Sequence, residues 1–315
     1  MTPYDRSAPP RRRSRWTLAV PVIAALVAAP LTAPVIAGAV AADAGLVASY
    51  PLDETSGTVA RDTSGNGRNA TFEGGPTLAG ADGVRLDGND DDVKLPNDIL
   101  KGLDSITVST DVIVRPEQSG NYFIWGLGNT TDWYGNGYLF ATGNPARTGI
   151  ALGNWTTEQK AESTTALERG VWKKLTYTLD AASKTSRMYI DGVQIAENTN
   201  TTSLPSMIGG GTTTANYLGR SNYTPDKRLA GSLRDFRIYN RALTATEVKG
   251  LVKTPEDSAA VQSALSALAV TNIDDVRGNL TLPGTSQGLP VTWTTSNASV
   301  VTGDGVVTRQ SADAT

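Results

Sequence analysis

The sequence predicts an all-β protein in which an antiparallel jelly-roll β-sandwich is followed by a second, partial β-sandwich. Short segments alternate between apolar and polar residues, as half-buried strands do. Glycine, with 32 of 315 residues, recurs with Asn and Asp between these segments. Helical periodicity is scarce. Many short strands joined by such turns indicate a sandwich or jelly roll rather than an α/β fold.

The first 42 residues have the layout of a secretory signal peptide. Four arginines within residues 11–15 precede an apolar run over residues 16–42 that ends in small residues. Prolines interrupt this run and disfavour a continuous membrane-spanning helix: Pro21, Pro30 and Pro34. We expect export to the extracellular space, by the general or the twin-arginine route, and no membrane attachment after cleavage.

Charge and composition exclude several classes of function. Residues 1–42 hold five arginines and one aspartate, so the remaining chain has 23 basic and 30 acidic residues and a formal charge of −7. Nucleic acids and anionic lipids bind to clusters of Lys and Arg, so neither is an expected partner of this acidic chain. The sequence contains no histidine, which excludes catalytic and metal sites that require imidazole. It contains no cysteine, so packing without disulfides must stabilise a domain of about 200 residues.

The predicted jelly roll spans residues 43–252. Apolar residues recur at every second position in SITVSTDVIVRP and in KKLTYTLD, which predicts two strands. Asp191-Gly192 lies between two further apolar runs and predicts a tight β-hairpin. Near the end of this domain, Thr244 and Glu247 have the spacing of a capping box and predict one short helix.

A polar, proline-bearing stretch over residues 253–258 is typical of a linker. Residues 259–315 again alternate, with Gly and Pro turns, and Trp293 is suited to the core of a small sandwich. Fewer than 60 residues follow the linker, against about 100 in a typical immunoglobulin-like domain. We therefore expect this second domain to be partial and the chain to be the front of a longer protein.

Several motifs, in order along the chain, resemble the laminin-G-like jelly rolls of the concanavalin A-like superfamily found in bacterial secreted proteins. They are GLVASYPLDETSG, DTSGNGRNAT, VRLDGNDDDVKLP, MYIDGV and SLRDFRIYNRALTATEV. Residues 259–315 resemble the atypical bacterial immunoglobulin-like module. This pair of domains is similar to the N-terminal part of multidomain glycosidases, including family-43 enzymes that act on arabinan and xylan.

The resemblance implies a structural calcium ion bound by Asp62, in DTSGNG, and by Asp235, in the last strand. The alternative for Asp62 is that it caps its own turn. Two departures from the family weaken the implied site: Val93 follows the acidic run in place of a large aromatic residue, and Arg234 occupies a position that is commonly acidic. The run from Asn89 to Asp92 is interpreted as a solvated acidic turn, because its acids do not alternate as in a calcium loop.

Aromatic residues on loops are the candidates for binding sugar, because a ring face stacks on the C–H face of a furanose or pyranose. Five aromatic residues meet this description: Trp133, Tyr134, Tyr138, Trp155 and Tyr223. Trp125 lies in the apolar FIWGL and Trp172 opens a strand, so core packing is expected for both.

The expected function is that of a non-catalytic carbohydrate-binding module, which holds a glycosidase domain outside this sequence on plant-type polysaccharide. The partner would be a polysaccharide or oligosaccharide, and the protein is expected to be monomeric. No acid-bearing motif resembles a catalytic one, although the parent protein is expected to be a glycoside hydrolase. Two alternatives stay open: a protein-interaction or adhesion module, and a purely structural accessory domain.

Overall fold

A computed structural model describes residues 22–26, 44–129, 135–253, 263–271, 276, 278–287, 289–295 and 299–308. The chain divides into two compact units, one formed by Ala37–Val252 and the other by Met1–Ile36 with Lys253–Thr315. No helix among the described residues is long and apolar enough to cross a membrane. Of the predicted signal peptide, residues 22–26 alone are described.

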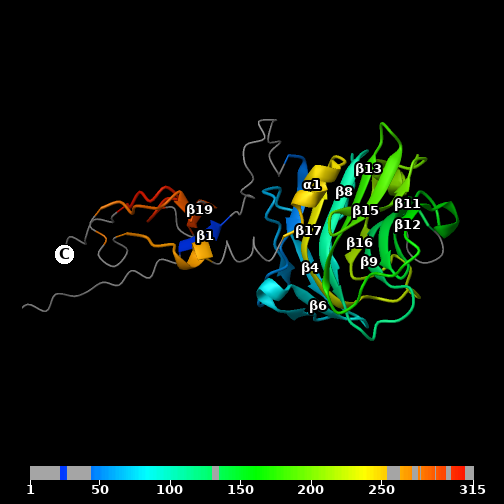
Figure 1. The fold of residues 1–315 in the computed structure, drawn as a ribbon, viewed down its shortest axis with the longest axis horizontal. Helices are drawn as coiled ribbons and strands as arrows, with labels where there is room; N and C mark the ends of the chain where they lie inside the picture. Colours follow the sequence, from blue (N-terminus) through cyan, green and yellow to red (C-terminus); the bar gives the residue numbers. More distant parts are fainter. Residues whose placement is uncertain are drawn as a thin grey trace, which may run out of the picture. The chain divides into compact units, whose positions relative to one another are not determined.

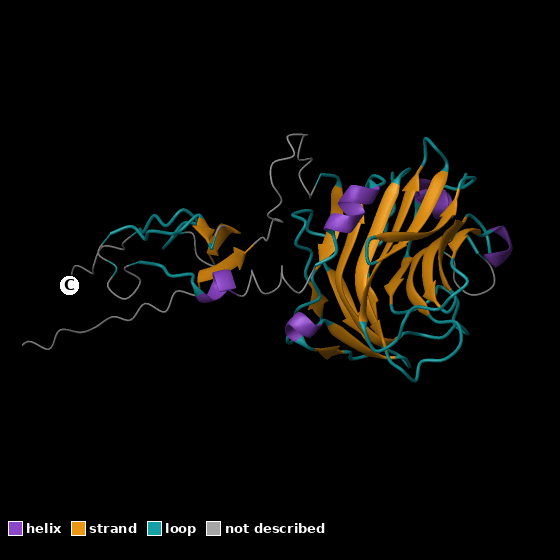
Figure 2. Cartoon of the chain, in the orientation of Figure 1, coloured by secondary structure: helices purple, strands orange, loops and turns teal. Residues whose placement is uncertain are grey.

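The larger unit is a sandwich of two antiparallel eight-stranded sheets, which confirms the predicted all-β class (Figures 1 and 2). The first sheet has the order β12-β11-β10-β9-β16-β7-β4-β3. Its strands are β12 (Gln159–Glu162), β11 (Ala146–Ala151), β10 (Tyr138–Gly143), β9 (Phe123–Gly128), β16 (Ala215–Leu218), β7 (Asp92–Lys94), β4 (Ala70–Glu73) and β3 (Val59–Ala60).

The second sheet has the order β15-β14-β13-β8-β17-β6-β5, with β2 also paired to β17. Its strands are β15 (Val193–Asn198), β14 (Thr185–Ile190), β13 (Trp172–Asp180), β8 (Ile106–Val114), β17 (Ala230–Tyr239), β6 (Val84–Asp87), β5 (Thr77–Leu78) and β2 (Leu46–Tyr50). The 3-10 helices are η1 (Gly80–Asp82), η2 (Trp155–Thr157) and η3 (Pro205–Gly211), and the α-helix is α1 (Ala245–Gly250).

The local predictions for this unit are confirmed. The two alternating segments form the neighbouring strands β8 and β13. Asp191 and Gly192 have φ angles of 51° and 74°, and they join β14 to β15 as a two-residue turn. The capping box is present at the start of α1, where Thr244 Oγ1 accepts from the backbone N–H of Glu247 and the Glu247 carboxylate accepts from the backbone N–H of Thr244.

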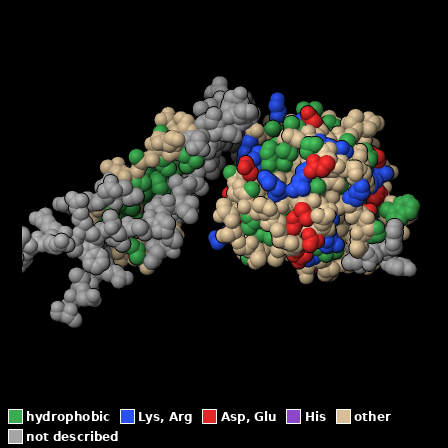
Figure 3. Space-filling model, turned by 90° about the horizontal axis from the view of Figure 1, so that it is seen from below, with side chains coloured by type: hydrophobic (Ala, Val, Ile, Leu, Met, Phe, Trp, Pro, Cys, Tyr) green, Lys and Arg blue, Asp and Glu red, His purple; other side chains and the backbone are tan. Residues whose placement is uncertain are grey.

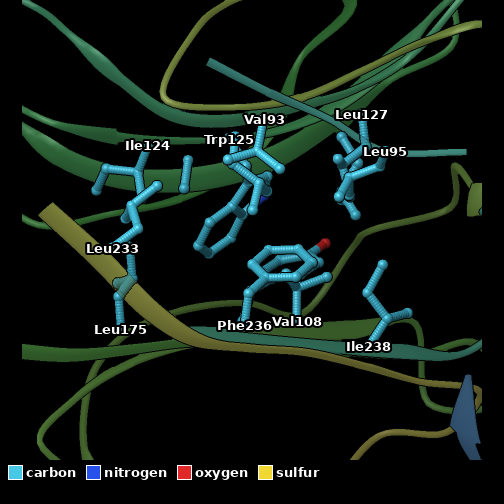
Figure 4. Packing of buried hydrophobic residues seen from close by; sticks show 14 of the residues in the cluster. Val93, Leu95, Val108, Ile124, Trp125, Leu127, Leu175, Leu233, Phe236 and Ile238 are labelled. Atoms are coloured by element: carbon cyan, nitrogen blue, oxygen red, sulfur yellow. The ribbon is translucent and has the colours of Figure 1, made fainter. Parts of the chain in front are cut away.

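The core lies between the two sheets (Figure 4). Trp125 from the first sheet packs edge-on against Phe236 from the second, with ring centroids 6.3 Å apart. Both side chains are fully buried, as expected for Trp125. Since successive side chains of a strand point to opposite faces, the same strands also carry polar side chains outward. Figure 3 shows acidic and basic side chains interspersed on one face of this unit.

The smaller unit contains a three-stranded antiparallel sheet of β1 (Val22–Leu26), β19 (Leu289–Thr295) and β18 (Thr285–Ser286). Trp293 is half-buried, and its indole N–H donates to the carbonyl oxygen of Pro283 at 2.8 Å. Val291 and Leu280 are buried in this unit.

Candidate functional site

A hollow of about 640 Å³ opens on the outer face of the first sheet, at β9 to β12. Leu139 and Ala141 of β10 point into the main core, so the alternate residues Tyr138 and Phe140 point to this outer face. We call this cavity the aromatic hollow. It is lined by Asn121, Phe123, Tyr138, Arg147, Trp155, Thr156, Glu158, Lys160, Tyr223, Pro225 and Asp226.

Buried aromatic rings form the floor of the aromatic hollow. Phe123, Tyr138, Phe140 and Tyr223 belong to a hydrophobic cluster separate from the main core. The Tyr138 ring lies 5.5 Å from the Phe140 ring and 5.5 Å from the Tyr223 ring, with the latter pair edge-on. The guanidinium of Arg147 lies over Phe140, 5.0 Å from the ring centroid. These contacts fix the floor, because each ring is held by at least one neighbour.

A hydrogen-bonded carboxylate lies beside this floor. The Tyr138 hydroxyl donates to Glu158 Oε1 at 2.5 Å, and Arg147 Nη1 lies 3.2 Å from Glu158 Oε2. Burial, strengthened by the neighbouring Glu158, raises the pKa of Tyr138 well above its ordinary value. The hydroxyl therefore stays protonated at all physiological pH and remains a donor to Glu158. Both groups are positioned before any ligand arrives.

Asp226 supplies a second carboxylate from the turn after Tyr223. The Ser221 hydroxyl donates to Asp226 Oδ2 at 2.6 Å and accepts from the backbone N–H of Tyr223 at 3.0 Å. Burial raises the pKa of Asp226, although the Ser221 hydrogen bond and the positive charge of Arg147 oppose this shift. The aromatic hollow thus has two carboxylates and the cations Arg147 and Lys160 around a hydrophobic floor.

Trp155 differs from the other aromatic residues of the hollow because 58% of the residue is exposed. It is the first residue of η2, and Asn154 caps this turn by accepting from the backbone N–H of Thr156 at 3.1 Å and from its hydroxyl at 2.6 Å. The backbone N–H of Gly153 also donates to Thr157 Oγ1 at 3.3 Å. A hydrogen-bonded turn therefore presents a large apolar ring to solvent at the rim of the hollow.

The structure brings three of the five predicted aromatic residues, Tyr138, Trp155 and Tyr223, to this one hollow. Trp133 and Tyr134 lie outside the described residues. The rings of Tyr138 and Tyr223 are buried in the floor, and Trp155 alone of the three is an exposed platform. Sequence reasoning missed the charged residues Arg147, Glu158 and Asp226. The side of β11 on which Arg147 lies could have been found from alternation in ARTGIA. Glu158 and Asp226 each follow an aromatic candidate by three residues, and this spacing could have pointed to them.

The expectation of core packing for Trp172 is wrong. Leu175, Tyr177 and Leu179 of β13 point into the core, so Trp172 shares the outer face with Lys174. Trp172 is half-buried there and lines a second hollow of about 420 Å³. The alternation of side chains along this strand predicts that Trp172 faces outward. The expectation of core packing came from the general tendency of tryptophan to be buried.

Asp62 forms the cap of its own turn. Its Oδ1 accepts from the backbone N–H groups of Ser49 at 3.0 Å and Ser64 at 2.9 Å, and its Oδ2 accepts from that of Arg68 at 2.9 Å. Burial acts to raise the pKa of Asp62, but hydrogen bonds from Ser64, Ser49 and Arg68 outweigh it and hold the pKa below its ordinary value. Three N–H donors thus use most of the acceptor capacity of this carboxylate, as the alternative of a turn cap predicts.

Asp235 lies in a buried ion-pair network on the outer face of the second sheet. It has a φ of 51° at a register shift in β17, and this bulge turns its side chain outward. Its carboxylate lies 2.8 Å from Lys174 Nζ and 2.8 Å from Arg237 Nε. Lys174 Nζ is also 2.9 Å from Asp111. Two cations surround Asp235, which disfavours a divalent cation at the same oxygens.

A different acidic cluster has a geometry that could hold a metal ion. Carboxylate oxygens of Asp87, Asp90 and Asp91 lie within 4.8 Å of one another, and this is the one such group among the described residues. The backbone N–H of Asn89 donates to Asp87 at 2.7 Å and that of Asp87 donates to Asp91 at 3.0 Å. The neighbouring Asp92 is buried and pairs with Arg220 and Arg228.

Comparison with known proteins places this fold in a family. Residues 87–249 match the model of the concanavalin A-like lectin/glucanases superfamily, and residues 257–315 match that of the atrophied bacterial Ig domain. No protein of curated function matches the sequence.

Solved structures share the fold of the larger unit. Domain 4 of AbnA, a GH43 extracellular arabinanase from Geobacillus stearothermophilus solved with arabinotriose, aligns with a TM-score of 0.52 and 23% identity over 67% of this chain and 99% of that domain. The Trypanosoma rangeli sialidase aligns with a TM-score of 0.50 and 17% identity over 66% of this chain and 33% of the sialidase. The chain belongs to the concanavalin A-like lectin/glucanase superfamily.

Proposed function

We propose that the larger unit is a non-catalytic carbohydrate-binding module and that the aromatic hollow is its binding site. One observation carries the proposal: an exposed tryptophan, Trp155, stands at the rim of a hollow whose polar groups are already fixed. Sugars need both elements, because their C–H faces are apolar while their hydroxyls require hydrogen-bond partners.

The two parts of the hollow would contact different parts of the sugar. The Trp155 ring stacks on the C–H face of a furanose or pyranose ring. Glu158 and Asp226 accept from hydroxyl groups, and Arg147 and Lys160 donate to hydroxyl or ring oxygens. Because Tyr138 and Ser221 hold the two carboxylates, little side-chain entropy is lost on binding.

We propose arabinan and related plant-type polysaccharides as the ligand class. The fold shared with an arabinanase domain solved with arabinotriose supports this choice. In this proposal the protein is secreted and carries a glycosidase domain outside these 315 residues. Holding that domain on an insoluble polymer would raise the effective concentration of its substrate.

The test measures arabinotriose binding by calorimetry and retention of the full chain on insoluble arabinan, xylan, cellulose and chitin. Trp155→Ala should weaken arabinotriose binding at least about tenfold, equivalent to about 1.4 kcal/mol. Trp172→Ala removes a second partly exposed tryptophan among the described residues of this unit, far from the aromatic hollow in strand order, and is the matched control: it should bind arabinotriose as the wild type does. No reducing ends should be released. Equal binding by wild type and Trp155→Ala, with both folded, would refute this site, and no retention on any polymer would favour a structural or protein-binding role.

We also propose calcium as the cation of this chain, at the cluster of Asp87, Asp90 and Asp91 rather than at Asp62 and Asp235. Hard carboxylate oxygens suit calcium, which accepts six to eight oxygen ligands. Excess calcium should raise the melting temperature above that in chelator, and Asp90→Asn should remove the difference. An identical melting temperature in both conditions would disprove calcium binding.

A further inference from the structure

The second hollow, of about 420 Å³, lies on the outer face of the other sheet and is separate from the aromatic hollow. We call it the arginine hollow; its lining includes Asp82, Arg85, Arg115, Gly170, Trp172 and Ser232. We propose that it binds a carboxylate-bearing sugar, such as a uronate unit of an acidic polysaccharide. This site does not depend on the function proposed for the aromatic hollow.

One row of paired residues across four neighbouring strands forms part of the lining of the arginine hollow. Trp172 of β13 pairs with Ile113 of β8, Ile113 pairs with Ser232 of β17, and Ser232 pairs with Arg85 of β6. Directly paired residues of antiparallel strands point to the same face, so an aromatic ring, a hydroxyl and a guanidinium lie in line across four strands. A sugar lying along this row would meet all three groups.

Trp172 is held in place from one side. The guanidinium of Arg234 lies over its ring, 4.2 Å from the ring centroid. Arg234 is itself fixed, because its Nε is 3.2 Å from Asp111 Oδ2 and its Nη1 donates to the carbonyl oxygen of Ala81 at 3.2 Å. Arg234 therefore orients the tryptophan, and the half-buried ring remains part of the wall of the hollow.

Arg85 and Arg115 are the free cations of the arginine hollow. Neither guanidinium has an ion pair or a side-chain hydrogen bond with the part of the chain that the structure describes, whereas Arg234 and Arg237 on the same sheet both pair with aspartates. Asp82 also lines the hollow, and among the described residues it forms no ion pair with either guanidinium. Two unpaired positive charges against one negative charge favour an anionic ligand, in a protein whose formal net charge is −3.

The chemistry favours a uronate over a neutral sugar or a simple anion. A guanidinium presents a planar fork that matches a carboxylate with two parallel hydrogen bonds. The tryptophan adds an apolar surface that a small anion would not use, but that the C–H face of a sugar would. The volume lies within the range of about 300–1,000 Å³ typical of small-ligand sites.

The experiment titrates trigalacturonate into the full chain and its variants by calorimetry. We expect Arg85→Gln with Arg115→Gln to weaken binding at least tenfold and to leave arabinotriose binding unchanged. Arg61→Gln with Arg68→Gln removes the same charge elsewhere on this unit and should bind trigalacturonate as the wild type does. Trp155→Ala should also leave trigalacturonate binding unchanged, so failure at one hollow is distinguishable from failure at the other.

Two ligand controls distinguish the contribution of the sugar ring to binding from that of the carboxylate charge. The methyl ester of trigalacturonate should bind at least tenfold more weakly than the acid, and acetate should not compete at concentrations where glucuronate does. The proposal is overturned if trigalacturonate does not bind, if its ester binds equally well, or if the Arg85 and Arg115 double variant binds as the wild type does. If acetate competes as well as glucuronate does, the hollow is a site for simple anions and the proposed saccharide ligand is wrong.

Discussion

Lys174 shows at the scale of one residue how the outer face of the second sheet is stabilised. Its side chain is only 3% exposed and lies between the carboxylates of Asp111 and Asp235, at 2.9 and 2.8 Å. Each charge in this network is acceptable in a buried position because an opposite charge compensates it. The bulge at Asp235 is the backbone feature that brings the second carboxylate to the lysine.

We predict that Lys174→Met destabilises the larger unit by about 1–3 kcal/mol, because two buried carboxylates lose their shared cation and keep only Arg234 and Arg237 as partners. Urea denaturation measures this loss. Lys101→Met removes an exposed lysine and should change the free energy of unfolding by less than about 0.5 kcal/mol. Equal stability of the two variants would contradict the role assigned to Lys174.

Glu247 makes the stability of the same unit depend on pH. Hydrogen bonds from Arg241, and then from Thr244, lower the pKa of Glu247 from 4.5 to about 2. A carboxyl group with a lowered pKa in the folded state stabilises the protein above its unfolded pKa and loses this contribution as pH falls through its folded pKa. Wild type should therefore lose stability as pH falls from about 4.5 to about 2.

Glu247→Gln measures this contribution directly. The difference in unfolding free energy between wild type and the variant should be largest above pH about 4.5 and shrink toward pH about 2. Urea denaturation across this pH range provides the measurement. A difference that is constant with pH would mean that the charge of Glu247 does not stabilise the fold.

At the scale of elements, the hairpin between β14 and β15 shows how a two-residue turn sets both register and packing. Its turn residues have positive φ angles, which fit the twist of the flanking strands. A Cβ added at Gly192 would lie 3.0 Å from the Cα of Lys249 and 3.2 Å from Val252 Cγ2. The absence of a side chain at Gly192 thus also allows the last turn of α1 and Val252 to approach the hairpin.

We predict that Gly192→Ala destabilises the larger unit by about 1–2 kcal/mol, through the left-handed backbone and the close contact together. Gly250→Ala is the matched control, because a Cβ at Gly250 meets nothing within 4 Å and the residue ends α1. That substitution should be neutral or stabilise by up to about 1 kcal/mol. If both substitutions had the same effect, the turn conformation would not be responsible.

At the scale of the whole molecule, the chain consists of two compact units. The main hydrophobic cluster lies entirely within the larger unit, between its two sheets. Both hollows are lined by residues of this unit alone. Folding and binding by the larger unit should therefore not require the rest of the chain.

A fragment of residues 44–252 should melt within about 2 °C of the corresponding transition of the full chain, and should bind arabinotriose and trigalacturonate with unchanged affinity. A stability difference of about 1 kcal/mol would already shift the melting temperature of a domain this size by about 2–4 °C. Calorimetry on both proteins is the measurement. If the fragment fails to fold, the larger unit depends on the rest of the chain for its stability.

Local features of this protein could be predicted from the sequence because they depend on neighbours in the chain. Alternation predicted β8 and β13, the Asp191-Gly192 pair predicted the hairpin, and the spacing of Thr244 and Glu247 predicted the start of α1. Each depends on backbone geometry within a few residues. The aromatic candidates Tyr138, Trp155 and Tyr223 were found from composition, because large aromatic residues stand out in polar segments.

The sequence by itself thus determined the all-β class and the family. It also determined the local turns and the helix cap, because their energies arise within short segments. The tertiary structure decided which distant residues meet. It placed Glu158 beside Tyr138, aligned Trp172 with Arg85 through the register of four strands, and paired Asp235 with Lys174. The physical reason is that strand register and sheet order depend on packing across the whole sandwich, so one bulge or one step of register changes which side chains share a face.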